Sequence, residues 1–222
     1  MCIRDRAIDT DAINKIVMNG LATPSDQFVP ESHIGYADGM SFREMYPVDI
    51  DKAKELMAEA GANAVLCPAG NLKTKSGIAP ARGYIESGVN LGVGCDNCSC
   101  GDAQNMFQAM KLLCGLAAIS DPEPGPPSAA DAMRIATVGG ARAAGLDGKV
   151  GAIQVGMKAD ISILDLASLA LVPLNSAARQ LVFAEGGAGV ETVIVAGQIV
   201  VEERRLTTID EVALRQTVED VM

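Results

Sequence analysis

The stretch that decides the fold is Gly92-Val93-Gly94-Cys95-Asp96-Asn97, in which a carboxylate follows directly on a short apolar run. That run, residues 89–94, has the length and composition of a buried parallel strand. A charged side chain that leaves such a strand costs free energy unless it is paired, protonated or bound to a metal. An Asp after a strand is also a common turn or N-cap residue. Asp96 is therefore a candidate functional carboxylate, and its neighbours must decide between these roles.

Alternating helix and strand patterns surround this stretch. Residues 49–60 carry apolar side chains at helical spacing, with acidic residues in the first turn and Gly61 at the end. Residues 62–67 form another short apolar run, and residues 81–87 form another helical pattern that ends at Gly88. Helix, glycine, buried strand and helix in this order predict an α/β fold with parallel strands and crossover helices.

Two further helices are predicted after the strand, over residues 103–119 and 128–138, with a proline-rich loop between them. Ser128 has the residue type of an N-cap. Gly139-Gly140 follows a helix and not a strand, so the pair is not a dinucleotide-binding fingerprint. We expect these glycines to allow close packing of the helix.

The last third of the chain predicts a β-rich module. β-branched residues alternate or cluster between glycines over residues 149–166 and 192–202, and Ala196-Gly197 has the composition of a hairpin turn. Residues 209–222 have the pattern of an acidic amphipathic helix.

Composition excludes several classes of function. The chain has 222 residues, of which 49% are hydrophobic, so it can bury a sizeable core. A net charge of −10 without a concentrated basic patch argues against nucleic-acid binding. No apolar run reaches the roughly 18 residues of a membrane-spanning helix. Six cysteines without a signal peptide favour reduced thiols in a cytoplasmic protein.

Four blocks of the chain resemble, in order, the motifs of the amidohydrolase superfamily, in its aminohydrolase and chlorohydrolase branch of cytosine deaminase-like and triazine hydrolase-like enzymes. Residues 67–80 resemble HCPxSNxKLxSGxAP, and residues 88–97 resemble GVxVxLGTD. Residues 136–146 resemble ATxGGAxALGL, and residues 151–160 resemble GSIExGKxAD. Together these blocks are specific for the superfamily and not for one substrate.

The resemblance implies a TIM-like (β/α)8 barrel, with Asp96 after the eighth strand, and a composite β-sandwich domain. We therefore expect residues 7–146 to be the C-terminal part of the barrel. Residues 147–222 would be the C-terminal part of the sandwich with a final helix. Residues 1–6, MCIRDR, resemble a translated sequencing adapter, and we expect an adapter-derived artefact in front of a C-terminal fragment.

In this family the matching Asp binds a divalent metal, usually zinc, and transfers the proton of the metal-bound water. The resemblance therefore implies that Asp96 is a metal ligand and the catalytic carboxylate, with iron as an alternative metal. The family's other metal-binding histidines are absent, and His33 is the only histidine in the chain. His33 is either the family's catalytic His of the sixth strand or a loop residue. Four polar residues are expected to shape the loops around Asp96: Asn71, Ser76, Asn97 and Asn105.

Two further features qualify the resemblance. Leu66 stands where relatives often have the His of HCP, and Gly70 replaces the Ser of the motif. Cys95, Cys98 and Cys100 form a CxxCxC pattern that could bind zinc or an iron–sulfur cluster, with Cys67 or Cys114 as a fourth ligand. Because no second CxxC pair has zinc-ribbon spacing, we favour a role at the rim of a pocket.

The sequence as a whole favours a metal-dependent hydrolase that acts on a C–N bond of a cyclic or amidine-like small molecule. A deaminase of a purine, pyrimidine or triazine fits best. Dechlorination and amide hydrolysis are alternatives because both need the same metal-activated water. An inactive, truncated chain is the alternative from another class. We expect a small-molecule substrate and, for the full-length protein, a homo-oligomer.

Overall fold

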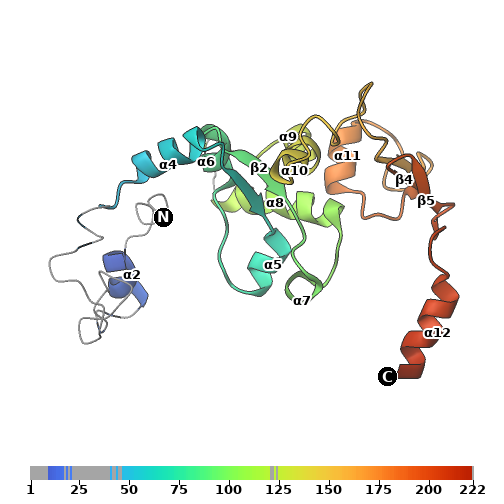
Figure 1. The fold of residues 1–222 in the computed structure, drawn as a ribbon, viewed down its shortest axis with the longest axis horizontal. Coiled ribbons are helices and arrows are strands. Elements are labelled where there is room, and N and C mark those ends of the chain that lie inside the picture. Colours follow the sequence, from blue (N-terminus) through green and yellow to red (C-terminus); the bar gives the residue numbers. More distant parts are fainter. Residues whose placement is uncertain are drawn as a thin grey trace. The chain divides into compact units, whose positions relative to one another are not determined.

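The computed structural model describes residues 10–17, 19, 21, 41, 44, 47–120, 123 and 125–221 (Figure 1). The chain divides into two compact units, residues 1–62 and 63–222. The described helices of the first unit include α2 (Thr10–Val17) and α4 (Ile50–Glu59). Asp49 begins α4, since its carboxylate accepts a hydrogen bond from the Lys52 N–H at 2.9 Å. The helix predicted over residues 49–60 is thus confirmed, whereas His33 lies outside the described residues.

The second unit is built on two parallel strands, β1 (Asn63–Leu66) and β2 (Asn90–Val93). Helix α6 (Ala81–Glu86) lies between them in the sequence, as the crossover pattern predicts. Helix α8 (Met106–Ser120) follows β2 in the chain (Figure 1). It contributes five residues to the buried core: Ala109, Met110, Leu113, Cys114 and Ala117. The α/β class predicted from the sequence is confirmed for this unit.

Two short helices follow the strands directly, α5 (Pro68–Lys73) after β1 and α7 (Cys98–Gly101) after β2. Pro68 stands in the first turn of α5, where its missing N–H would have no helical partner. Neither helix is predicted from the sequence, because four to six residues contain too few turns to show a helical period.

The next helical segment consists of α9 (Ala129–Arg134), the π-helix η1 (Ile135–Gly139) and α10 (Gly140–Ala143). Ser128 is its N-cap, as predicted, in a capping box with Asp131. A Cβ added at Gly139 would overlap the carbonyl oxygen of Leu91 in β2. The expected close packing at this glycine is therefore confirmed.

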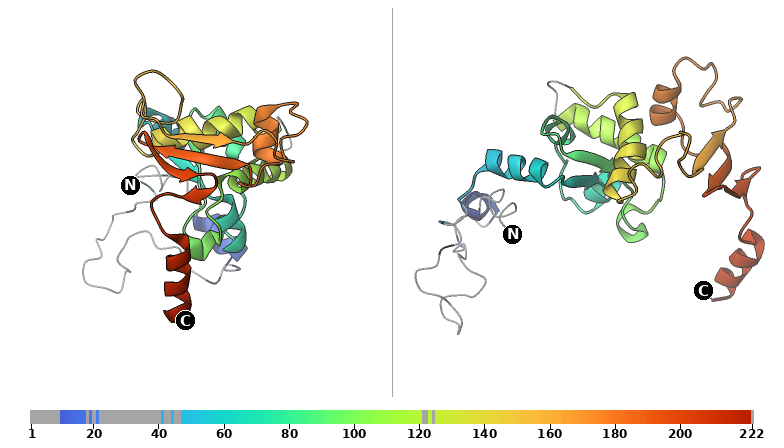
Figure 2. Two further views of the ribbon diagram at one scale, coloured as in Figure 1. Left: turned by 90° about the vertical axis from the view of Figure 1, so that its right-hand side faces the viewer. Right: turned by 45° about the horizontal axis from the view of Figure 1, so that its top comes forward.

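The C-terminal part of the second unit holds an antiparallel sheet in the order β3-β4-β5-β6. The strands are β3 (Ile161–Leu164), β4 (Val190–Val195), β5 (Gln198–Glu202) and β6 (Arg205–Leu206), and Figure 2 shows the ribbons of the sheet side by side. Ala196 and Gly197 turn between β4 and β5 with φ of 51° and 84°, which confirms the predicted hairpin. Residues 149–160 form turns and no strand, so the β-rich expectation was wrong there.

Two helices complete this part of the chain. Helix α11 (Ala177–Phe183), which the sequence analysis did not predict, packs against α8 and α9 and buries Val182 completely. Helix α12 (Glu211–Val221) begins two residues later than predicted and has no buried residue. No helix in the part of the chain that the structure describes is long and apolar enough to cross a membrane.

Candidate functional site

The candidate site lies at the edge where β1 and β2 both end. Because the strands are parallel, with Leu66 paired to Val93, the segments that follow them leave the sheet at the same edge. Helices α5 and α7 contact each other there (Figure 1). The Lys73 ammonium group joins them, since it lies 2.5 Å from Oδ1 of Asp102 and 3.2 Å from the Ser99 carbonyl oxygen.

Asp96 occupies the turn between β2 and α7. Its backbone has a φ of 62°, a left-handed conformation that Asp tolerates better than most residues. Oδ1 accepts a hydrogen bond from the Asn97 N–H at 2.7 Å, and the carbonyl oxygen accepts one from Nε2 of Gln104 at 2.6 Å. Oδ2 lies beside Gly70 of α5, where an added Cβ would be 3.0 Å away. Asp96 is exposed, and these contacts hold it at the edge of the sheet where β2 ends.

Asn97 follows as the N-cap of α7. Its Oδ1 accepts hydrogen bonds from the backbone N–H groups of Ser99 and Cys100, both at 3.0 Å, and from the Ser99 hydroxyl at 2.6 Å. These bonds satisfy N–H groups that a helix start leaves unpaired. Asn97 therefore fixes the backbone directly after Asp96.

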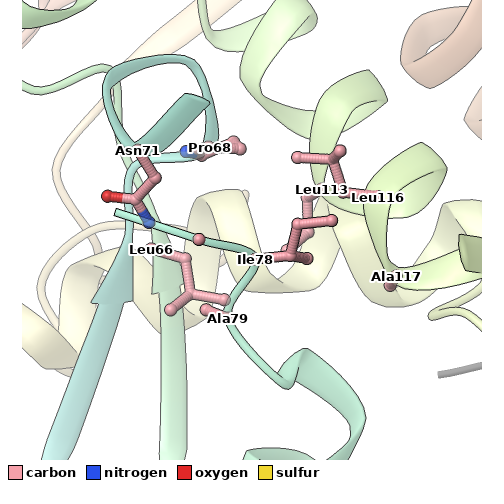
Figure 3. Close-up of a pocket in the computed structure, with 9 residues that line it drawn as sticks. Leu66, Pro68, Asn71, Ile78, Ala79, Leu113, Leu116 and Ala117 are labelled. Carbon is pink, nitrogen blue, oxygen red and sulfur yellow. The ribbon is translucent and has the colours of Figure 1, made fainter. Parts of the chain in front are cut away.

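Asn71 and Ser76 lie in the segment after β1. The Asn71 carbonyl oxygen accepts a hydrogen bond from the Ser76 N–H at 2.9 Å, and the Ser76 hydroxyl is 2.7 Å from that of Thr74. Asn71 also lines a small cavity together with apolar residues of β1 and α8, among them Leu66 and Leu113 (Figure 3). At about 20 Å³ this cavity has room for roughly one water molecule and not for a substrate.

Asn105 precedes α8 and does not lie within it, because this helix begins at Met106 and not near residue 103 as predicted. Its Oδ1 accepts a hydrogen bond from the Gln108 N–H at 3.0 Å and so caps the helix. Its Nδ2 donates to the Gly186 carbonyl oxygen at 2.7 Å. The backbone N–H of Asn105 also hydrogen-bonds the Cys95 sulfur.

The thiols near the site differ in exposure. Cys98 is exposed, whereas Cys95 is buried, and burial together with the neighbouring Cys67 raises the pKa of the Cys95 thiol. Burial also raises the pKa of Cys114 in α8 to about 11. A raised pKa opposes formation of the thiolate, which is the form that binds metals. Within residues 47–120 and 125–221 and the shorter described stretches, no group of three or more His, Cys, Asp or Glu could hold a metal ion.

The described residues therefore offer Asp96 as a candidate metal ligand but do not provide a complete set of metal ligands. Sequence reasoning identified Asp96 and its neighbour Asn97 but missed Gln104, which binds the Asp96 backbone. It also missed Glu185, a carboxylate that is only 4% exposed. A Glu followed by two glycines suggests an exposed turn, and nothing in the local pattern signals its burial.

Comparison with known proteins identifies the class. The model of the Amidohydrolase family matches residues 6–200, and the chain belongs to this family. The 5-methylthioadenosine/S-adenosylhomocysteine deaminase of Acetivibrio thermocellus is 34% identical over 166 residues, which are 75% of this chain and 38% of that protein. The 5'-deoxyadenosine deaminase of Methanosarcina mazei is 35% identical over 157 residues, 71% of this chain and 36% of the other. The chain thus spans under two fifths of these relatives.

Solved structures agree with this assignment. An adenosine deaminase from Xanthomonas campestris with bound zinc superposes with a TM-score of 0.73 at 35% identity, over 77% of this chain and 39% of the other. Atrazine chlorohydrolase from Arthrobacter aurescens, complexed with zinc, has a TM-score of 0.68 at 26% identity, over 76% and 37% of the two chains.

Proposed function

We propose that the chain belongs to a metal-dependent hydrolase that deaminates an adenosine-like small molecule, with Asp96 as a metal ligand and catalytic carboxylate. The observation that carries this proposal is the exposed Asp96 carboxylate at the common edge of β1 and β2. Membership of the amidohydrolase family supports it, as do two curated relatives that are named deaminases of adenosine derivatives.

We also propose that β1 and β2 belong to a TIM-like barrel within residues 7–146, and that β3 to β6 belong to a composite β-sandwich within residues 147–222. The carboxyl ends of the strands hold the active site in such barrels. This architecture would place Asp96 at the mouth of the barrel.

The metal in this proposal is zinc, as in the two similar solved structures. A bound zinc ion lowers the pKa of its water ligand toward neutrality. Asp96 would be one ligand, and the described residues do not complete the set. His33 would be the family's catalytic histidine of the sixth strand and not a metal ligand. Asn71, Ser76, Asn97 and Asn105 would shape the loops of the site.

Dechlorination of a triazine is the second candidate function, because atrazine chlorohydrolase shares the fold over most of this chain. The higher identity to the adenosine deaminase favours deamination, 35% against 26%. A cytoplasmic location and a homo-oligomer remain predictions.

Ammonia release from 5'-methylthioadenosine, S-adenosylhomocysteine and adenosine tests the proposal, with chloride release from atrazine as the alternative readout. The protein should be made from the complete reading frame. Asp96→Asn should lower turnover about 10²- to 10⁴-fold, as expected for loss of an acid–base group.

Asp102→Asn is the matched control, because Asp102 has a nearly identical φ of 61° and lies at the end of α7. It should keep activity within about threefold of the parent, since it breaks only an exposed ion pair. Turnover that survives Asp96→Asn, or no turnover of any of these substrates, would contradict the proposal.

A further inference from the structure

Glu185 is a buried carboxylate in the loop that follows α11. Its side chain is 4% exposed, and Oε1 accepts hydrogen bonds from the N–H groups of Gly186, Gly187 and Gly189 at 3.1, 2.7 and 3.0 Å. One charged oxygen thus orders the backbone of residues 186–189. Such bonds to a charged acceptor are stronger than neutral ones.

The second oxygen of this carboxylate is unusual. Oε2 is buried and has no hydrogen-bond partner in the described part of the chain. A buried carboxylate oxygen without a partner costs free energy, and the three hydrogen bonds to Oε1 offset this cost. The loop closes tightly around it, because a Cβ added at Gly189 would lie 2.6 Å from Oε2.

The ordered loop is connected to the candidate site through one peptide group. The Gly186 N–H is bound by Glu185, and the Gly186 carbonyl oxygen accepts the bond from Nδ2 of Asn105. Asn105 in turn contacts the Cys95 sulfur through its backbone N–H. Cys95 directly precedes Asp96, and Gln104, directly before Asn105, binds the Asp96 carbonyl oxygen.

We infer that Glu185 is a positioning residue for Asp96. It holds the Gly186 carbonyl oxygen where Asn105 can bind it, and Asn105 then anchors the far end of the segment 96–105. A carboxylate from the C-terminal part of the chain thereby fixes the turn at the end of β2. The link to catalysis rests on the role proposed for Asp96, whereas the mechanical link does not.

Hydrogen–deuterium exchange on the full chain, without metal or substrate, tests the mechanical link. Glu185→Ala should speed exchange of amides 97–105 about tenfold, as expected when one or two supporting hydrogen bonds are lost. Asn105→Asp should do the same, since it removes the Nδ2 donor and keeps the oxygen that caps α8. The double variant should exchange no faster than the faster single variant, because both substitutions break one connection.

Glu185→Gln is the conservative variant and should stay within about threefold of the parent protein, because it keeps an acceptor oxygen. Gly189→Ala is an independent probe that displaces the carboxylate and should reproduce the effect of Glu185→Ala. Gly186→Ala is its control, since nothing lies within 4 Å of the added Cβ.

A uniform rise in exchange over residues 63–221, additive effects in the double variant, or no change at 97–105 would each overturn the inference. In the active enzyme, Glu185→Ala should lower kcat for 5'-methylthioadenosine more than it changes KM, and Glu185→Gln should restore it. If the proposed role of Asp96 is wrong, this would appear separately, as unchanged ammonia release in Asp96→Asn. The exchange result would then still stand.

Discussion

Gly70 of α5 lies directly against the carboxylate of Asp96, so that a Cβ on Gly70 would be 3.0 Å from Oδ2 and 3.2 Å from the Cβ of Asp96. Gly70 is itself buried. The helix after one strand thus limits where the carboxylate after the next strand can lie. A Cβ at position 70 would require the Asp96 side chain or α5 to shift by a few tenths of an ångström.

Gly70→Ala should therefore disturb the site although it raises helix propensity. Alanine in place of a helical glycine normally stabilises by roughly 0.5–1 kcal/mol. We expect this gain to be cancelled and ammonia release to fall about tenfold, which corresponds to about 1.4 kcal/mol. Gly83→Ala in α6 is the control, since its Cβ meets only the Pro80 Cβ at 3.8 Å. Equal stability and activity in the two variants would show that Gly70 does not constrain Asp96.

Gly139 and Gly140 form a matched pair for the packing of η1 on β2. A Cβ at Gly139 overlaps the Leu91 carbonyl oxygen, whereas one at Gly140 meets only Ile135 O at 3.9 Å. Gly139→Ala should cost about 2–3 kcal/mol of unfolding free energy because backbone atoms must separate. Gly140→Ala should be neutral or slightly stabilising. Urea denaturation measures both, and similar values would refute the close approach.

The capping box at the start of α9 should make the free energy of unfolding depend on pH at low pH. Hydrogen bonds from the Ser128 hydroxyl and backbone N–H hold the pKa of Asp131 below its usual value of 3.8. A lowered folded-state pKa gives stability that is present above pH 3.8 and is lost as the pH falls through the folded pKa. Asp131→Asn should therefore cost about 1 kcal/mol near pH 6 and progressively less below pH 3.8. A difference that stays constant down to pH 2 would contradict the cited bonds.

The buried thiol of Cys114 should make the unfolding free energy depend on pH in the opposite direction, with a loss at high pH. Burial, with a smaller effect from Asp131, raises its pKa from 9.0 to about 11. The raised pKa stabilises the neutral thiol, so the contribution is complete below pH 9 and is lost as the pH rises through 11. The unfolding free energy of the parent should fall by up to about 2 kcal/mol relative to Cys114→Ala over this range. The control is Cys98→Ala, which keeps Cys114, and its unfolding free energy should fall with pH as that of the parent does. An equal pH dependence of the unfolding free energy in Cys114→Ala and Cys98→Ala would exclude a buried thiol at position 114.

Much of the α/β unit could be predicted from the sequence, because a buried strand and an amphipathic helix leave periodic patterns. That reasoning placed β1, β2 and α6 and put Asp96 at a strand end. It missed α5 and α7, which are too short to be periodic. It extended α8 back to residue 103, because a cap such as Asn105 depends on where the hydrogen bonds begin and not on the apolar pattern.

The contacts of the site could not be predicted, because they join residues that are distant in the sequence. Gly70 meets Asp96 only once β1 and β2 are paired, and Glu185 is buried only once its loop folds back toward Asn105. His33 lies outside the described residues, so its role stays a prediction. The motif blocks identified the family, but the sequence pattern did not identify the other ligands of a metal site.

Zinc analysis of the protein purified from the complete reading frame tests the role of Asp96 most directly. We predict stoichiometric zinc in the parent protein and in Cys98→Ala, and a loss of that zinc in Asp96→Asn without loss of the fold. Zinc that is retained in Asp96→Asn but lost in Cys98→Ala would assign the metal to the cysteines and contradict the account.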